Sequence, residues 1–285
     1  MIKLALTDLD DTLIPFSNDA DRHASDRAVE AIRTAQAAGL EVGPVTGRPP
    51  QAMQWMFPGH PECYATGAFV NGQIVCVDGR ETCRKVLRHD ALQATVEVLD
   101  QMDCDCWLAI YDVDGPERTR LVTRFPERVR ANTPVPSRGG VEVLDRVPDE
   151  DIVKANLQCS CDRQTMARVR DAVSAKVDDF DLFFPSMTAP VIDISPAGWG
   201  KGEGARALAE VLGLSMDEVC AFGDSDNDLP MIEAVPNSVA VANASAAVSA
   251  RARWHIGASR DEAVADALLE LARAYRAGEM PSFMR

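Results

Sequence analysis

Three groups of polar and acidic residues each follow a short apolar run in this 285-residue chain. The groups are Asp8-Leu9-Asp10-Asp11-Thr12 after residues 2–7, Thr46-Gly47-Arg48 after 40–45, and Gly223-Asp224-Ser225-Asp226-Asn227-Asp228 after 219–222. In an open parallel sheet, ligands bind outside the carboxyl ends of the strands. If the apolar runs are strands of one such sheet, the three groups converge at one edge.

Clustered carboxylates such as Asp8, Asp10 and Asp224 repel one another and are costly to bury unless a cation neutralises them. Oxygen ligands of this kind suit Mg²⁺, which takes one or two carboxylates together with a substrate phosphate. An EF-hand calcium loop does not fit residues 224–235, because Leu229 replaces the required Gly and Val235 the required Glu. Acidic loops that only cap helices are the simpler alternative for any single group.

The elements that would position these groups alternate between strand and helix at the start of the chain. Residues 2–7 and 40–45 are predicted strands, and a helix is predicted over 25–38 with Ser25 as its N-cap and Gly39 as its stop. Asn71-Gly72 predicts a hairpin turn between apolar runs at 63–70 and 74–77. Pro44 breaks a rule, because proline cannot donate to a strand ladder.

The pattern changes at residue 83 and returns after residue 188. The expected fold class is therefore α/β: a doubly wound, Rossmann-like parallel sheet core (1–82 and 189–285) with an inserted α+β cap domain (83–188). In the insertion, helices are expected near 88–102 and 162–177, and strands at 107–111, 120–123, 155–161 and 181–184. The returning core is expected to contain strands at 191–194, 219–222, 238–241 and 254–256, and helices at 201–212 and 261–276.

Composition argues against several classes of partner. The formal net charge is −15, and an acidic surface repels phosphate backbones and anionic lipid, so neither nucleic acid nor membrane is expected as a partner. No apolar run is long enough to span a bilayer, and the first six residues do not resemble a signal peptide. The expected compartment is the cytoplasm, and the expected oligomeric state is a monomer or a small homo-oligomer.

The eight cysteines are expected to be free thiols in a reducing compartment. Two pairs in the insertion, Cys104/Cys106 and Cys159/Cys161, have the spacing at which strand residues face one side. Neighbouring strands would turn the two pairs into a four-thiolate zinc site. The alternative is that these cysteines are small buried core residues.

Taken together, the motifs resemble those of the haloacid dehalogenase superfamily and, within it, the Cof-type (IIB) phosphatases. The resemblance rests on Asp8-Leu9-Asp10-Asp11-Thr12-Leu13, Thr46-Gly47-Arg48, Asn71-Gly72, Lys201-Gly202, Gly223-Asp224-Ser225-Asp226-Asn227-Asp228-Leu229-Pro230-Met231 and Ser238-Val239-Ala240-Val241-Ala242-Asn243-Ala244. It covers both core segments in detail and the insertion only by size and place. Two departures are Asp11, where the family commonly has glycine, and Pro44.

This resemblance implies a magnesium-dependent phosphatase acting on a small phosphorylated metabolite, with a sugar phosphate as the expected substrate. Asp8 would attack phosphorus to form an aspartyl-phosphate, and Asp10 would act as acid and then base, which requires a raised pKa for Asp10. Thr46 and Lys201 would hold phosphoryl oxygens. Further substrate-binding candidates are Gly47, Arg48, Asn71 and Asn227. The Mg²⁺ candidates are Asp8, the Asp10 carbonyl, Asp224 and Asp228.

Three alternatives remain open at this point. A phosphomutase would share the motifs and differ only in passing the phosphoryl group to a sugar. A non-catalytic binding protein would retain the fold, but the nucleophile and the metal ligands show no damage. A carbon–halogen hydrolase is disfavoured by Asp10 and by the set from Lys201 to Asp228.

Overall fold

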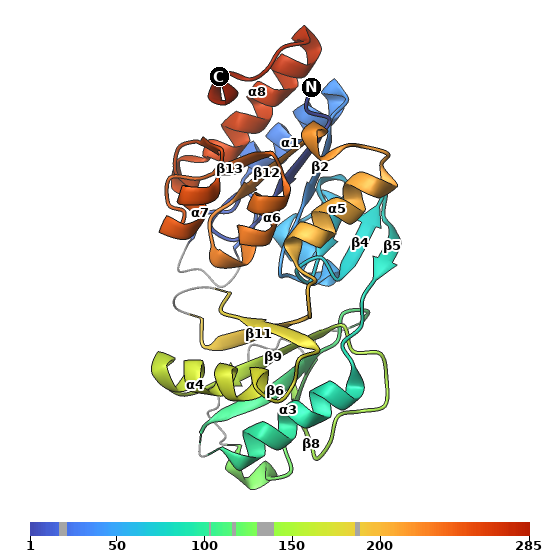
Figure 1. Cartoon of the computed structure of the whole chain (residues 1–285). Coiled ribbons are helices and arrows are strands. Elements are labelled where there is room, and N and C mark those ends of the chain that lie inside the picture. The colour runs from blue at the N-terminus through green and yellow to red at the C-terminus, as the bar shows by residue number, and fades with distance from the viewer. Residues whose placement is uncertain (17–21, 103, 116–117, 130–139, 186–188) are drawn as a thin grey trace. The chain divides into compact units, whose positions relative to one another are not determined.

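The computed structural model describes residues 1–285 except 17–21, 103, 116–117, 130–139 and 186–188 (Figure 1). The chain forms two compact units. The first combines Met1–Arg84 with Gly200–Arg285, and the second is Lys85–Trp199. Among the described residues, no helix combines the length and the apolar composition needed to cross a membrane.

A five-stranded parallel sheet forms the centre of the first unit, in the order β14-β13-β12-β1-β2. Its strands are β1 (Leu4–Thr7), β2 (Glu41–Pro44), β12 (Val219–Gly223), β13 (Asn237–Ala240) and β14 (Trp254–His255). Every residue of β1 and β12 is buried, as expected for strands covered on both faces. The N-terminal strand therefore lies inside the sheet, between strands from distant parts of the chain.

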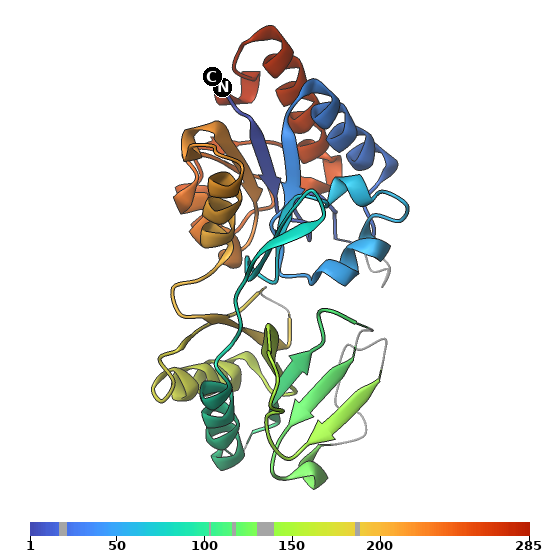
Figure 2. The ribbon, with the colours of Figure 1, turned by 90° about the vertical axis from the view of Figure 1, so that its right-hand side faces the viewer.

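Helices cover both faces of this sheet (Figure 2). The longer helices are α1 (Asp26–Ala38) and α8 (Ala263–Ala277) on one face, and α5 (Lys201–Val211) on the other with α6 (Leu229–Ala234). The remaining ones are α2 (Met53–Met56) and α7 (Ala246–Arg251). The predicted ends of α1 are confirmed: the Ser25 side chain accepts from the Ala28 amide, and Gly39 ends the helix with φ 100°.

Beside the parallel sheet, β3 (Gly67–Phe69), β4 (Ile74–Val77) and β5 (Arg80–Arg84) form a three-stranded antiparallel sheet. The hairpin predicted at Asn71-Gly72 joins β3 to β4. The structure also explains Pro44. The amides of Glu41 and Val45 donate to β1, so the Pro44 nitrogen, at the alternate position, faces away from β1. No bond of the β1–β2 ladder is lost, and the proline ring packs beside Gly67.

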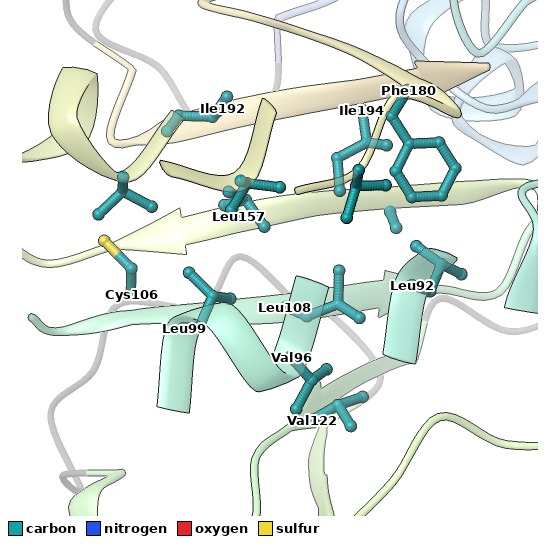
Figure 3. Close-up of a cluster of buried hydrophobic side chains, with 14 of the residues drawn as sticks. Leu92, Val96, Leu99, Cys106, Leu108, Val122, Leu157, Phe180, Ile192 and Ile194 are labelled. Carbon is teal, nitrogen blue, oxygen red and sulfur yellow. The ribbon is translucent and has the colours of Figure 1, made fainter. Parts of the chain in front are cut away.

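In its described residues, the second unit consists of one sheet packed against the helices α3 and α4. The sheet order is β10-β11-β9-β6-β7-β8, antiparallel except for the parallel pair β7–β8. Its elements are α3 (His89–Gln101), β6 (Cys106–Tyr111), β7 (Thr119–Val122), β8 (Val141–Leu144), β9 (Lys154–Cys159), α4 (Arg163–Ser174), β10 (Phe180–Phe183) and β11 (Val191–Pro196). Leucine, isoleucine and valine side chains of α3, β6 and β9 fill its core (Figure 3).

One strand lies in a different unit from the one expected. The run at 191–194 was expected to open the second core segment, but β11 pairs with β9 and β10 in the sheet of the second unit. Its apolar residues Ile192 and Ile194 are buried in the core of that unit. Apolar content alone does not tell a strand which sheet to join, so the expected end of the insertion was wrong. Residue 188, where that end was placed, lies outside the described residues.

Candidate active site

Lys201 is the centre of the site and is 1% exposed. Its Nζ donates to Asp8 Oδ1 and to Asp228 Oδ1, both at 2.6 Å. Asp8 is the first residue after β1, and Lys201 is the first residue of α5. Burial lowers the pKa of Lys201, but the two carboxylates outweigh it and the pKa rises, so the ammonium stays charged.

Asp228 organises the loop that follows β12. Its Oδ1 accepts from Lys201, and its Oδ2 accepts from the amides of Asp224 and Ser225 at 2.9 and 3.0 Å. This carboxylate reaches the backbone because residue 223 is glycine: a Cβ there would lie 2.8 Å from the Asp228 Cβ. Asp228 is therefore committed on both oxygens to holding Lys201 and the loop.

Asp224 points toward the same cluster, where carboxylate oxygens of Asp8, Asp224 and Asp228 lie within 4.8 Å of one another. Its Oδ1 accepts from the Thr12 hydroxyl at 2.7 Å. Burial, together with the nearby charge of Asp228, raises the pKa of Asp224 to about 7. The pKa of Asp8 is also raised, by burial against the opposing effect of Lys201. These buried carboxylates are thus only partly neutralised by Lys201.

Asp10 differs from its expected state. Burial acts to raise its pKa, but Arg48 binds both carboxylate oxygens through Nε and a terminal nitrogen, each at 2.9 Å. Arg22 adds a second cation at 3.5 Å. The pKa of Asp10 is therefore lowered, and the expectation of a raised pKa was wrong for this state of the protein.

The loop after β2 is fastened to the β3–β4 hairpin. The Thr46 hydroxyl accepts from the Arg48 amide, and the Asn71 amide donates to the Thr46 carbonyl at 2.9 Å. A Cβ on Gly47 would lie 3.1 Å from the Asn71 side-chain oxygen, so only glycine fits there without displacement. Hydrogen bonds from backbone amides and close packing therefore hold the loop at Thr46, Gly47 and Arg48 against Asn71.

Asp11 has an unusual backbone, with φ 62° in the left-handed region. This explains why glycine is common at the equivalent position of the family that the sequence resembles, and why a short polar residue is tolerated there. The Asn243 side chain donates to the Asp11 carbonyl at 2.8 Å and fixes the turn.

Most residues expected at the site lie in one of two groups. The first is the cluster of Lys201 with Asp8, Asp224 and Asp228, and the second is the segment of Thr46, Gly47, Arg48 and Asn71, to which Asp10 is joined through Arg48. Asn227 is an exception: its side-chain oxygen accepts from Ser225 within its own loop, which gives it an ordering contact. The sequence motifs contained Thr12 and Asn243 without assigning them a role. No sequence signal marked Arg22, whose pairing with Asp10 depends on the fold.

The cluster is suited to a hard divalent cation. Asp8 and Asp224 supply oxygen donors, carry more negative charge than Lys201 offsets, and are buried beside one another. Cations of this kind prefer carboxylate and carbonyl oxygen. The clustered side chains of Asp8, Asp224 and Asp228 offer only carboxylate oxygens.

The raised pKa values predict an unusual dependence of stability on pH for chelator-treated protein. Between about pH 4 and pH 7 the folded chain retains a proton on Asp224 that the unfolded chain has released. Unfolding free energy should therefore fall as pH rises through this window, by on the order of 4 kcal/mol in total. Urea denaturation across this range measures it. Asp224→Asn should flatten the dependence of unfolding free energy on pH. If the variant kept the wild-type dependence, the raised pKa of Asp224 would be contradicted.

Comparisons with known proteins identify the family of the chain. A family model described as haloacid dehalogenase-like hydrolase matches residues 5–268. The pyridoxal phosphate phosphatase YbhA of Escherichia coli (strain K12) is 42% identical over 74 residues, which are 26% of this chain and only 27% of that protein. The putative phosphatase M6_Spy0533 of Streptococcus pyogenes serotype M6 is 26% identical over 277 residues, covering 94% of this chain and 97% of that protein.

Solved structures share the fold over nearly the whole chain. The HAD subclass IIB sugar phosphatase BT4131 superposes with a TM-score of 0.71 at 15% identity, covering 93% of this chain and 97% of that chain. Identity this low makes the likeness one of fold alone.

Proposed function

The chain belongs to the haloacid dehalogenase-like hydrolases, and from that premise we propose that it is a magnesium-dependent phosphatase of small phosphorylated metabolites. The observation that carries the proposal is the buried cluster in which Lys201 bridges Asp8 and Asp228 beside Asp224. An ammonium, a nucleophilic carboxylate and a hard-cation site in contact match the requirements of phosphoryl transfer.

Asp8 is the proposed nucleophile. Its Oδ1 is held by Lys201, which leaves Oδ2 to attack phosphorus and form an aspartyl-phosphate as the bond from phosphorus to the leaving alkoxide breaks. Water, deprotonated by Asp10, would then attack the phosphorus of this intermediate, releasing phosphate and restoring the Asp8 carboxylate. Lys201, which is charged and buried, would stabilise the negative charge on the phosphoryl oxygens as the bond forms. Thr46, at the end of the neighbouring strand, is a further proposed donor to those oxygens.

Asp10 is the proposed acid and base, and Arg48 is its regulator. In the paired state Asp10 is an ionised acceptor, so it can protonate a leaving alkoxide only after Arg48 releases it and its carboxylate has taken up a proton from solvent. A substrate anion that binds the Arg48 guanidinium would separate Arg48 from Asp10. Substrate binding would then precede proton donation by Asp10.

Asp8, the Asp10 carbonyl and Asp224 are the proposed Mg²⁺ ligands. Asp228 supports them through Lys201 and the loop amides. When bound, Mg²⁺ would screen the repulsion between the Asp8 carboxylate and an incoming phosphate and stabilise transition-state charge.

The proposed substrate class is the sugar phosphates. One structural neighbour is named as a sugar phosphatase, and curated relatives are named as phosphatases of other small metabolites. Phosphate release from sugar phosphates and from a chromogenic aryl phosphate, with Mg²⁺ or with excess chelator, tests the proposal. Magnesium-dependent release supports it. Folded, metal-loaded protein that releases no phosphate but isomerises a sugar phosphate would indicate a mutase instead.

Asp224→Asn is expected to raise the Mg²⁺ concentration needed for half-maximal activity by on the order of 100-fold. The amide oxygen can still accept from Thr12, so the loop is retained while the ligand charge is lost. Activity measured across a magnesium titration reports the change. Asp226→Asn is the matched control, because Asp226 is an exposed carboxylate of the same loop that contacts Ser245. Equal midpoints for the two variants would remove Asp224 from the ligand set.

A further inference from the structure

The second unit contains a compact group of four cysteines that the proposed phosphatase chemistry does not use. They are Cys104, Cys106, Cys159 and Cys161, and all four are free thiols. Cys106 opens β6 and Cys159 closes β9, and the two residues are directly paired across these antiparallel strands. The ladder continues past the strand ends, because the Ser160 amide donates to the Asp105 carbonyl at 2.7 Å.

This register places the four thiols on one face. Paired residues of an antiparallel ladder share a face, and residues two apart on a strand do so as well. Cys104, Cys106 and Cys159 accordingly belong to one buried core cluster, with Cys161 partly buried against it. Figure 3 shows the Cys106 sulfur in the row of core side chains that also contains Leu99 and Leu157.

The sulfur positions are close to those of a tetrahedral metal site. Cys106 Sγ and Cys161 Sγ lie 3.5 Å apart, and the Sγ atoms of Cys106, Cys159 and Cys161 all lie within 4.8 Å of one another. The Cys104 side chain interacts with that of Cys106. Four thiolates around Zn²⁺ at about 2.3 Å would be separated by about 3.8 Å, a spacing comparable to that of the Cys106, Cys159 and Cys161 sulfurs. Cys104, beside Cys106, would supply the fourth thiolate.

The surroundings complement the charge that such a site would carry. Four thiolates and one Zn²⁺ have a net charge of −2, which needs nearby cations. Arg128 donates to the Cys104 carbonyl at 3.3 Å. The contact with Cys106 and burial raise the pKa of the Cys104 thiol, and the Arg128 charge offsets part of that rise. Arg163, from the first turn of α4, lies close enough to Cys159 for their charges to interact. Partly buried Cys161 provides the side from which an ion can enter.

We propose that Cys104, Cys106, Cys159 and Cys161 form a structural zinc site that ties β6 to β9 in the second unit. The geometry favours one metal ion bound by several thiolates over a disulfide. The sulfurs of Cys106, Cys159 and Cys161 each have two sulfur neighbours rather than one. Soft thiolate donors select zinc over the hard cation proposed for Asp8 and Asp224. The two sites are therefore distinguishable by the chemistry of their ligands.

The test uses Co²⁺ as a probe in the whole protein, stripped with chelator, kept reduced, and supplied with excess Mg²⁺ to occupy the carboxylate cluster. We expect about one Co²⁺ per chain, with thiolate charge-transfer absorption and the intense visible bands of a four-coordinate ion, both lost when Zn²⁺ is added. Oxygen ligands cannot produce the charge-transfer absorption. Folded, reduced protein without these bands would overturn the proposal.

Variants locate the site. Cys106→Ser/Cys161→Ser should weaken Zn²⁺ binding by on the order of 100-fold or more, measured by competition with a chromophoric chelator. Cys76→Ser/Cys83→Ser changes two partly buried thiols of the first unit and should leave binding unchanged. If the first double variant does not fold, the single change Cys161→Ser removes the most exposed ligand and should still abolish the four-sulfur spectrum. Equal zinc affinity in both double variants would also refute the site.

Discussion

Replacing Asp8 with asparagine is expected to abolish phosphate release, by a factor on the order of 10⁴ or more, without unfolding the protein. Asparagine keeps an oxygen that can accept from Lys201, and Lys201 retains Asp228 as its counter-ion. The amide has no nucleophilic oxygen, so the first chemical step is lost. Initial rates and a thermal unfolding scan on the same preparation measure both parts of the expectation.

Asp11→Asn is the matched control for this experiment. Asp11 is a neighbouring acidic residue whose backbone carbonyl, rather than its carboxylate, carries the contact with Asn243. Asparagine tolerates the left-handed backbone at this position, so activity should change by only a few-fold.

Acid quenching during turnover should also add one phosphoryl mass to the Asp8 peptide of the wild type. An Asp8→Asn protein that keeps a tenth of the activity, with its mass verified against deamidation, would exclude Asp8 as the nucleophile.

Lys201→Met is expected to destabilise the protein by about 3–5 kcal/mol. Methionine fills a similar volume but leaves the Asp8 and Asp228 carboxylates buried without their shared cation, and breaking a buried pair is costly. The loss should shrink at low pH, where the carboxylates take up protons. Urea denaturation at neutral and acidic pH provides the measurement.

Lys3→Met separates burial from charge in that comparison. Lys3 also forms an ion pair at 2.6 Å, with Glu218, but its side chain is 47% exposed. Solvent screens an exposed pair of this kind, so the variant should be nearly neutral. Similar losses for both lysines would mean that the Lys201 pair does not lie in a desolvated site.

The sequence predicted the parts of the fold that local chemistry specifies. Ser25 and Gly39 defined α1 because capping and a left-handed stop are properties of single residues. Asn71-Gly72 defined the hairpin for the same reason. The sequence predicts strand β11 in the first unit, but β11 pairs with β9 and β10 in the second. Local sequence does not specify which strands a given strand will pair with. Pro44 could be explained only once the direction of its nitrogen was known.

The candidate site also has parts that local sequence specifies and parts that depend on the fold. Asp8, Lys201, Asp224 and Asp228 were identifiable because each follows a strand or opens a helix in a recognisable motif, and the structure brings them into contact. The lowered pKa of Asp10 was not predictable. It depends on a bidentate arginine from another loop and on Arg22, and neither pairing leaves a pattern in the sequence.

The position of β1 has a consequence for how the protein is made. β1 pairs with β2 soon after it in the chain, but its other neighbour, β12, begins at residue 219. During synthesis, β1 therefore has an open edge until most of the chain has left the ribosome, and such non-local pairing folds slowly. Lys201 and Asp228 are made similarly late, so a nascent chain would contain the proposed nucleophile, Asp8, long before the rest of the proposed site. An open apolar edge over that interval is a site for aggregation or chaperone binding.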